Sequence, residues 1–343
     1  MVEAVDPLAD AAWDEWVARQ PAAEFFHGSA WARVLRDTYG HRPVYQRIRD
    51  SQGQAAALPL MEVKSWLTGR RGIALPFTDF CNTLGGGPAD QAALQAAAMA
   101  EGRRAGWRYL ERRGSSDGWP DAPPSLSFWG HTIDLTGGPG RLRENLGSAP
   151  RRALRKAEKA GLKVEFRTDA AAMGLYYNLH CRTRRRHGLP PQSWGFFSRI
   201  QRGMAETGSA EIGLVMQERR AIAGSVYFWA GKRALYKFGA SDRAAQEARP
   251  NNLLMWRAVE RFAEKGFETL HLGRTSLSNE GLRRFKLGFG AREEKIHYHK
   301  FDFAKNAFVQ DVDKVEGWYN QMFARLPLFA LKLAGKLLYP HVS

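Results

Sequence analysis

The sequence predicts two α/β domains in tandem, each built on a mixed and mostly antiparallel sheet. The same order of elements occurs in outline in the first half and clearly in the second. In this order, helices are followed by antiparallel strands and then by a connecting helix and a strand. The 343 residues are enough for two compact domains. A composition with 44% hydrophobic and 25% charged residues is typical of a globular protein.

The first half reads as two short helices, a strand, a hairpin and a helix–strand unit. A Gly-Arg-Arg-Gly turn at residues 69–72 marks the hairpin, and a glycine-rich break at residues 85–88 precedes an alanine-rich helix. The expected helices are residues 7–19, 29–39 and 89–105, and the expected strands are residues 44–49, 55–63, 72–77 and 107–112.

The second half reads as two helices, a three-stranded meander and a crossover helix. Leu254, Ala258 and Phe262 put apolar side chains on one face of the crossover helix, and Gly266 is a suitable C-cap. The expected helices are residues 171–186, 194–206, 251–265 and 280–287, and the expected strands are residues 163–166, 210–217, 221–229, 234–238, 269–273 and 295–303.

No repeat is visible in the sequence itself, so the duplication follows from element order alone. We expect a first domain over residues 1–140 and a basic linker helix over 141–160. A second domain is expected over residues 161–310, and an amphipathic helical tail over 311–343.

The chain is strongly basic, with a formal net charge of +16 and a sequence pI near 10.1. Residues 141–200 contain fourteen Lys and Arg residues against four Asp and Glu. This segment is interpreted either as a solvated helix surface or as a binding site for phosphates, and both readings stay open.

Two distant cysteines, Cys81 and Cys181, indicate neither a disulfide framework nor a zinc cluster, which favours a reducing cytoplasm. The acidic N-terminus lacks the features of a secretion signal, and no stretch has the roughly 18 apolar residues of a membrane span. The tail at residues 326–339 is apolar around most of its circumference, with Lys332 and Lys336 on one side. It suits either the inner membrane interface, as a peripheral contact, or packing onto the body or a partner subunit.

The element order is that of the GNAT acyltransferase fold, so the predicted class is two tandem GNAT-like (acyl-CoA N-acyltransferase-like) domains. GNAT enzymes that use coenzyme A offer a glycine-rich loop to its pyrophosphate at the start of the crossover helix. Residues 248–253 contain no glycine, and Pro250 has no N–H to donate. This loop argues against a standard coenzyme A site, although Asn251 is expected to cap the helix.

Four blocks, at residues 151–164, 185–190, 239–242 and 281–291, resemble the Fem family of aminoacyl transferases, including the FemAB-like proteins. The resemblance spans roughly residues 25 to 300. It implies a tandem GNAT-like fold that moves an amino acid from aminoacyl-tRNA to an amine on a cell-wall precursor. It also implies that residues 1–140 form the acceptor side and residues 161–310 the donor and catalytic side. The donor ester is already activated, so neither a metal nor a covalent intermediate is required.

The resemblance assigns Phe285-Lys286 to the family's Phe-Lys pair, with the Lys286 ammonium stabilising the oxyanion and Phe285 walling the donor pocket. The alternative is a helix-surface lysine beside an apolar helix residue. For the base, the sequence offers Asp79, Asp242 or a substrate phosphate. Asp79 is equally suited to a turn.

Other candidates line the expected cleft or bind phosphates. The family often has a lysine shortly after the early tryptophan, whereas arginines, including Arg36, stand there in this chain. Aromatic residues on strands are more often core. Substrate-binding candidates are Arg274, Tyr236, Tyr227, Asn252, Asp242, Arg186, His187 and Arg36, and candidates for tRNA phosphates are Arg151, Arg152, Arg155, Lys156 and Lys159.

No metal is predicted, because His297 and His299 lack a third ligand nearby in sequence. No resident cofactor is expected, since aminoacyl-tRNA is a co-substrate. The acceptor is expected to be a lipid- or nucleotide-linked envelope precursor. One alternative is an N-acyltransferase using acyl-coenzyme A or acyl carrier protein in polysaccharide or exosortase-linked envelope biosynthesis. Another is a non-enzymatic RNA- or membrane-binding scaffold. The oligomeric state stays open.

Overall fold

A computed structural model of the chain describes residues 1–49, 56–114, 119, 121–313 and 317–342. The contacts divide the chain into two compact units. Unit 1 comprises Met1–Phe128, Lys295–Asp313 and Leu337–Ser343, and unit 2 comprises Trp129–Glu294 and Lys314–Lys336. The division therefore falls at residue 128, within a strand, and the tail is shared between the units.

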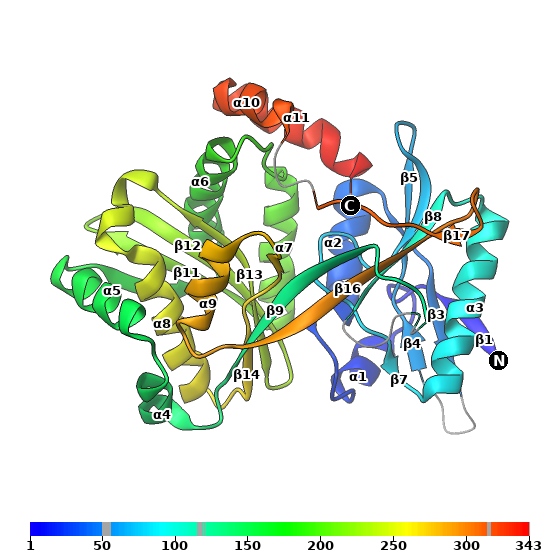
Figure 1. Cartoon of the computed structure of the whole chain (residues 1–343), viewed down its shortest axis with the longest axis horizontal. Helices are drawn as coiled ribbons and strands as arrows, with labels where there is room; N and C mark the ends of the chain where they lie inside the picture. Colours follow the sequence, from blue (N-terminus) through cyan, green and yellow to red (C-terminus); the bar gives the residue numbers. More distant parts are fainter. Residues whose placement is uncertain (50–55, 115–118, 120, 314–316, 343) are drawn as a thin grey trace. The chain divides into compact units, whose positions relative to one another are not determined.

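Unit 1 contains two groups of paired strands (Figure 1). One is an antiparallel sheet in the order β1-β3-β4-β7, on which helix α3 packs. The other has the order β8-β6-β5-β2, with β16 antiparallel to β8. The elements are β1 (Val2–Val5), α1 (Trp13–Ala18), η1 (Phe25–His27), α2 (Ser29–Tyr39), β2 (Arg42–Pro43), β3 (Tyr45–Ile48), β4 (Ala56–Leu58), β5 (Met61–Ser65), β6 (Gly69–Ile73), β7 (Leu84–Gly85), α3 (Pro88–Ala105), β8 (Tyr109–Gly114), β17 (Ala307–Phe308) and η3 (Tyr339–His341).

Strands β9 (Leu126–Asp134) and β16 (Arg292–Asp302) run from one unit into the other. In unit 2 the strand order is β10-β11-β12-β13-β14-β9, antiparallel except for the β13–β14 pair. The remaining elements are α4 (Gly138–Glu144), α5 (Ser148–Lys159), β10 (Lys163–Arg167), α6 (Ala170–Arg186), α7 (Trp194–Thr207), β11 (Ala210–Gln217), β12 (Arg220–Ala230), β13 (Arg233–Ser241), η2 (Arg243–Ala248), α8 (Pro250–Glu264), β14 (Thr269–His271), β15 (Thr275–Ser276), α9 (Glu280–Leu287), α10 (Trp318–Arg325) and α11 (Leu328–Leu338).

Helices cover both faces of the unit 2 sheet. Neighbouring residues on a strand point to opposite faces. A Cβ on Gly213 of β11 would contact Leu254 of α8, whereas a Cβ on Gly224, which is paired with Leu214, would contact Tyr176 of α6. Helices α8 and α6 therefore lie on opposite faces, and the main apolar core of this unit lies under α8.

The predicted elements of the meander and its flanking helices are confirmed to within a few residues, and five predictions are corrected. Residues 69–72, expected to form the hairpin turn, belong to strand β6, and the turn lies between Ser65 and Gly69. The expected strand at residues 55–63, whose first residue lies outside the described part, divides at Pro59 into β4 and β5, which belong to different sheets. The expected helix at 7–19 begins only at Trp13 and is preceded by β1. The expected linker helix at 141–160 is two helices, α4 and α5, with Gly147 as the N-cap of α5. Arg249, in the left-handed region, is the N-cap of α8 in place of Asn251.

Helix α11 is docked on unit 2 through a close backbone approach. Leu331 and Gly335, four residues apart, are buried, and a Cβ on Gly335 would lie 1.9 Å from the carbonyl oxygen of Pro191. Within unit 2 the part of the tail up to Lys336 therefore packs onto the body of the unit.

The close contact between Gly335 and Pro191 predicts that replacement by alanine changes the free energy of unfolding in opposite directions at two helical glycines. Gly335→Ala is expected to destabilise the protein by about 1–3 kcal/mol, because the methyl group overlaps Pro191. Gly203→Ala in α7 is the matched control, because no atom lies within 4 Å of its Cβ position. It should stabilise the protein by up to about 1 kcal/mol through helix propensity. Thermal unfolding of both variants checks this, and equal effects would contradict the packing of α11.

Candidate active site

Lys286 is a buried residue of α9, in unit 2. Asn279 begins this helix by accepting the N–H of Leu282 at 3.0 Å. The Lys286 side chain is 2% exposed, and its Nζ donates to the carbonyl oxygens of Gly273 at 2.8 Å and Arg274 at 3.1 Å. A buried ammonium is stable only with such partners. The alternative of a helix-surface lysine is therefore excluded.

The backbone that holds Lys286 is irregular. Gly273 adopts a φ of +72° between β14 and β15, which orients the two carbonyl groups toward the ammonium. Two residues later, the Thr275 hydroxyl is buried and has no hydrogen-bond partner among the described residues. Buried polar atoms normally have partners, so this hydroxyl is an exception among the described residues.

A second polar cluster, which the sequence did not predict, lies beside Lys286 on β9 and β16. His131 is fully buried, with Nε2 3.0 Å from Oε1 of Glu293. Arg283 donates two hydrogen bonds to the same carboxylate, from Nε to Oε1 at 2.8 Å and from Nη2 to Oε2 at 2.9 Å. Its guanidinium carbon lies 4.6 Å from the centroid of the Trp129 ring. The cluster ties α9 to the two strands.

Burial, followed by the positive charge of Lys286, lowers the pKa of His131 to about 4. Hydrogen bonds from Arg283 are the main cause of a lowered pKa of Glu293. The imidazole is therefore neutral at pH 7 and is a weak proton acceptor. It contacts Glu293, which Arg283 also holds, and it is not a candidate for the general base.

The neutral imidazole predicts a loss of stability in acid. Between the ordinary pKa of about 6.5 and the folded value, only the unfolded state binds the proton, so stability falls as the pH falls. We expect His131 to contribute a loss of about 2 kcal/mol from pH 7 to pH 5. His131→Gln, which keeps a donor for Glu293, should show a smaller loss in urea unfolding. An equal loss in both proteins would contradict the assignment.

A cationic pocket of about 450 Å³ lies between α5, the start of α8 and α9. Of the predicted residues it brings together Arg152 and Lys156 of α5, Asn252 of α8 and Phe285 of α9. Arg249 and Arg284, which sequence reasoning missed, also line it, and Lys156 Nζ lies 3.0 Å from Oε1 of Glu247. Four cations around one pocket suit a phosphate-bearing ligand.

The start of α8 offers few backbone donors to this pocket. Pro250 has no N–H, and the N–H groups of Asn252 and Leu253 donate to the Arg249 carbonyl at 3.2 and 3.3 Å. An anion in this pocket would therefore meet charged side chains rather than the backbone amides used in glycine-rich loops.

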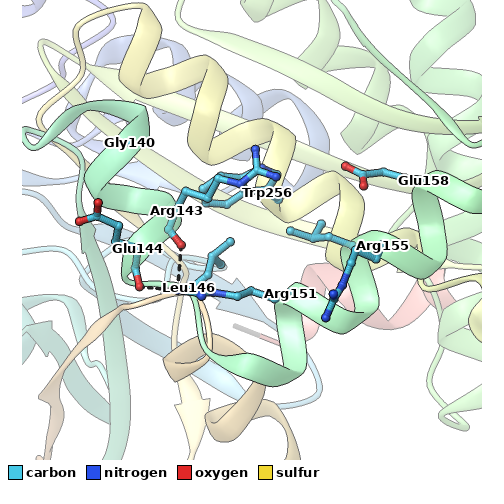
Figure 2. Close-up of a pocket in the computed structure, with 9 residues that line it drawn as sticks. Gly140, Arg143, Glu144, Leu146, Arg151, Arg155, Glu158 and Trp256 are labelled. Carbon is cyan, nitrogen blue, oxygen red and sulfur yellow. Dashed lines mark hydrogen bonds between the residues drawn. The ribbon is translucent and has the colours of Figure 1, made fainter.

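Arg151 and Arg155 of α5 line a separate pocket of about 550 Å³ with Arg143 and Trp256, shown in Figure 2. Arg151 Nη2 donates to the carbonyl oxygens of Arg143 at 3.3 Å and Glu144 at 2.7 Å, so this side chain caps the end of α4. Arg155 lines the same pocket. The five predicted phosphate ligands of α5 thus do not form one site. Lys159 is exposed at the end of the helix and lines neither pocket.

Two predicted tyrosines lie together on β12 and β13. Tyr227 is fully buried, and its ring centroid lies 5.8 Å from that of Tyr236. Burial raises the pKa of both phenols. A Cβ on Gly239 would lie 1.8 Å from the Tyr236 hydroxyl, so the glycine in the 239–242 block makes room for that side chain.

Asp242 and the neighbouring predicted residues hold the end of β13. Asp242 accepts the N–H of Ala244 and forms ion pairs with Arg220 and Arg182. Arg186 Nη1 lies 3.4 Å from the carbonyl oxygen of Ser241. The Asp242 carboxylate is thus engaged with two guanidinium groups. Separately, the His187 carbonyl at the end of α6 accepts Nδ2 of Asn320 at 3.0 Å, which fixes α10 on unit 2.

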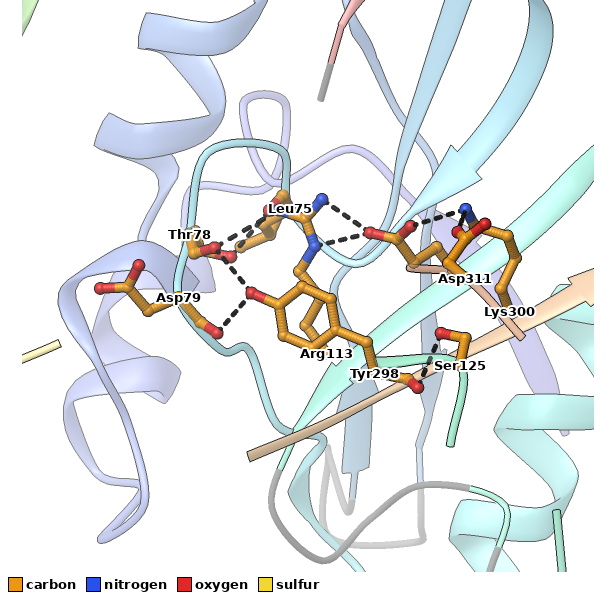
Figure 3. Close-up of polar contacts among 9 residues, drawn as sticks. Leu75, Thr78, Asp79, Arg113, Ser125, Tyr298, Lys300 and Asp311 are labelled. Atoms are coloured by element: carbon orange, nitrogen blue, oxygen red, sulfur yellow. Dashed lines mark hydrogen bonds and ion pairs between the residues drawn. The ribbon is translucent and has the colours of Figure 1, made fainter. Parts of the chain in front are cut away.

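Asp79 and Arg36 belong to unit 1. The main-chain oxygen of Asp79 accepts the Tyr298 hydroxyl at 2.7 Å, and Arg113 pairs with Glu111 at 2.7 Å. Figure 3 shows the Asp79 carboxylate directed away from Arg113 and Tyr298. Arg36 is exposed on α2 and pairs with Asp37 at 2.9 Å.

The histidine pair on β16 has other contacts. His297 Nδ1 lies 2.9 Å from the Ser127 hydroxyl, and the His297 and His299 rings are 6.4 Å apart. Among the described residues, no group of three or more His, Cys, Asp or Glu side chains is arranged to hold a metal ion.

Residues 148–295 match the family model described as an acetyltransferase (GNAT) domain. No curated protein is similar enough in sequence to be matched to the chain. Three solved structures are similar in fold. FemX is 13% identical, with a TM-score of 0.64, over 89% of this chain and 98% of its own. A tandem GNAT protein from the clavulanic acid biosynthesis pathway is 12% identical, with a TM-score of 0.57, over 88% and 98%.

The third structure is L-PGS from Bacillus licheniformis, 12% identical with a TM-score of 0.53 over 89% of this chain and 96% of its own. At these identities the likeness concerns the fold. It confirms the predicted fold class and the resemblance to a Fem-type fold. The chain therefore has a tandem GNAT-like fold, similar to that of FemX, and residues 148–295 are similar to the acetyltransferase (GNAT) domain.

Proposed function

We propose that the protein is an aminoacyltransferase that moves an amino acid from aminoacyl-tRNA to an amine of a cell-envelope precursor of the peptidoglycan type. The observation that carries the proposal is the buried ammonium of Lys286 on α9, one residue after Phe285, which lines the cationic pocket. The two features share one helix of unit 2.

Lys286 supplies the charge that this reaction needs. Attack of an amine on the donor ester forms a tetrahedral intermediate with a negative oxygen. An ammonium already held by Gly273 and Arg274 requires little reorganisation to bind that oxygen, and low solvent exposure strengthens the interaction. The protein then aligns donor and acceptor, and the proton passes to a phosphate of the substrate or to Asp242.

The cationic pocket supplies the site for the donor. Its side-chain cations suit the spaced phosphates of a tRNA 3′ end. A pyrophosphate of coenzyme A would favour backbone donors at the start of α8, where Pro250 lacks one and two others are engaged. The cations and the few backbone donors of this pocket therefore favour aminoacyl-tRNA over acyl-coenzyme A as the acyl donor.

The test is transfer from a mixed pool of radiolabelled aminoacyl-tRNA in the presence of envelope precursors. We expect label to move into an RNase-resistant product with the wild-type protein and not with Lys286→Met. Stabilisation by acetyl-coenzyme A, but not by tRNA, in thermal unfolding would overturn the choice of donor. Binding of tRNA without turnover on any precursor would instead favour the scaffold.

A further inference from the structure

The β5–β6 hairpin of unit 1 carries two large apolar side chains into solvent. Trp66 is 85% exposed and Leu67 is 55% exposed, in the turn between Ser65 and Gly69. Adjacent exposed residues of this size are not explained by folding, since they contribute nothing to a core. Tryptophan is the residue that most favours the boundary between water and a bilayer.

Basic side chains surround this turn. Lys64 and Arg70 are exposed and lie directly opposite each other in the β5–β6 register. Arg108 is also exposed, and its Nη1 lies 3.4 Å from the Thr68 carbonyl oxygen. Within the described residues, none of these three forms a salt bridge with an acid. Like charges opposite each other destabilise a hairpin, so an external anion would stabilise it.

The end of the chain is fastened to the same hairpin. The His341 carbonyl oxygen accepts the Thr68 hydroxyl at 3.1 Å and Arg71 Nη2 at 3.0 Å. The His341 Nδ1 lies 3.0 Å from the Ser65 hydroxyl, and its ring centroid is 5.4 Å from that of Trp66. Tyr339 is buried just before it.

These contacts place the last turn of α11 beside the hairpin within unit 1. Its Leu337 and Leu338 are 60% and 36% exposed. We refer to Trp66, Leu67, Leu337 and Leu338 as the interfacial patch.

The segments that carry this patch contain charges of one sign. Residues 63–73 and 337–343 contain no Asp or Glu, whereas they include basic residues at positions 64, 70 and 71. No described helix is long and apolar enough to cross a bilayer. Apolar anchors ringed by cations are typical of proteins that lie on an anionic bilayer surface.

We propose that the interfacial patch of unit 1 docks onto the surface of an anionic lipid bilayer. Trp66 and Leu67 enter the headgroup region, and Lys64, Arg70 and Arg108 contact lipid phosphates. Docking of this kind is reversible and salt-sensitive. It does not depend on the acyl acceptor.

The test is co-sedimentation of the full chain with vesicles of equimolar phosphatidylcholine and phosphatidylglycerol, compared with phosphatidylcholine alone. We expect binding to the anionic vesicles, weakened by salt. Trp66→Ser and Leu337→Ser should each weaken it by about tenfold through lost apolar burial. Lys64→Gln should weaken it about fivefold and only on anionic vesicles.

Two controls match these changes. Val312→Ser removes a side chain that is 75% exposed outside the patch, and Lys305→Gln removes an exposed charge outside it. Both should bind vesicles like the wild type, and melting temperatures should stay unchanged in all variants. The proposal is overturned if the full chain binds neither vesicle, if the patch variants bind like the controls, or if the patch variants abolish self-association in the absence of lipid. The last result would assign the surface to a second copy of the chain.

Discussion

Lys286→Met is expected to lower the rate of aminoacyl transfer by about 10²–10³-fold, the range for losing one oxyanion donor. Methionine keeps the length and apolar stem of the side chain but removes the ammonium. Binding of tRNA should change little, because Lys286 is not among the residues that line the cationic pocket. Single-turnover transfer from labelled aminoacyl-tRNA measures the rate, and filter binding measures the affinity.

The substitution also leaves the carbonyl groups of Gly273 and Arg274 without this donor, so folding must be measured alongside activity. Far-UV circular dichroism and the melting temperature serve that purpose. Lys305→Met, at an exposed position, is the matched control and should keep both rate and stability. A folded Lys286→Met protein with the wild-type rate would refute the oxyanion role.

Removing the charges of the cationic pocket is expected to have the second largest effect. In the triple variant Arg152→Ala, Lys156→Ala and Arg284→Ala, the affinity for tRNA should fall by about 10–100-fold at moderate salt. The slope of the logarithm of the binding constant against the logarithm of salt should decrease by about 2–3, since each phosphate contact contributes roughly 0.7–0.9.

The control has the same loss of charge elsewhere. Arg202, Arg219 and Lys305 are exposed and do not line the pocket, so their replacement by alanine should leave the salt dependence close to that of the wild type. If both triple variants lowered the affinity for tRNA equally, that affinity would depend on the net charge of the protein alone. The pocket would then lose its role as donor site.

Local patterns predicted most of unit 2. Helix α9 and strand β11 have the expected bounds, because each is a periodic segment between clear turn residues. Because the bounds of α9 were predicted correctly, the Phe-Lys pair and with it Lys286 were placed on the correct helix. Sequence could not show that the lysine is buried. That property depends on the carbonyl groups of residues 273 and 274, which belong to another element.

The polar cluster beside Lys286 was missed because strand β9 was missed. Its sequence at residues 126–134 lacks a strict alternation and follows a proline-rich stretch. His131 therefore lay outside every predicted helix and strand. Its partners Glu293 and Arg283 are distant in sequence, and only pairing of β9 with β16 brings them together.

The prediction of one linker helix over residues 141–160 was wrong, although the sequence contains residues that mark the break. Gly147 starts a new helix, and Pro150 lies in its first turn, where a missing N–H is tolerated. A single helix over 141–160 would have put Pro150 in its interior. The break between α4 and α5 opens the pocket of Figure 2 and commits Arg151 to capping α4.

The path of the chain sets an order for its folding during synthesis. Almost all of unit 2 is one continuous stretch, Trp129–Glu294, whereas unit 1 also needs Lys295–Asp313 and Leu337–Ser343. Until β16 has left the ribosome, β8 lacks its antiparallel neighbour, and the place of Tyr339 among Tyr39 and Phe77 stays empty. The half made first is thus completed last, and a nascent chain stalled at residue 290 would expose an unpaired strand edge to chaperones.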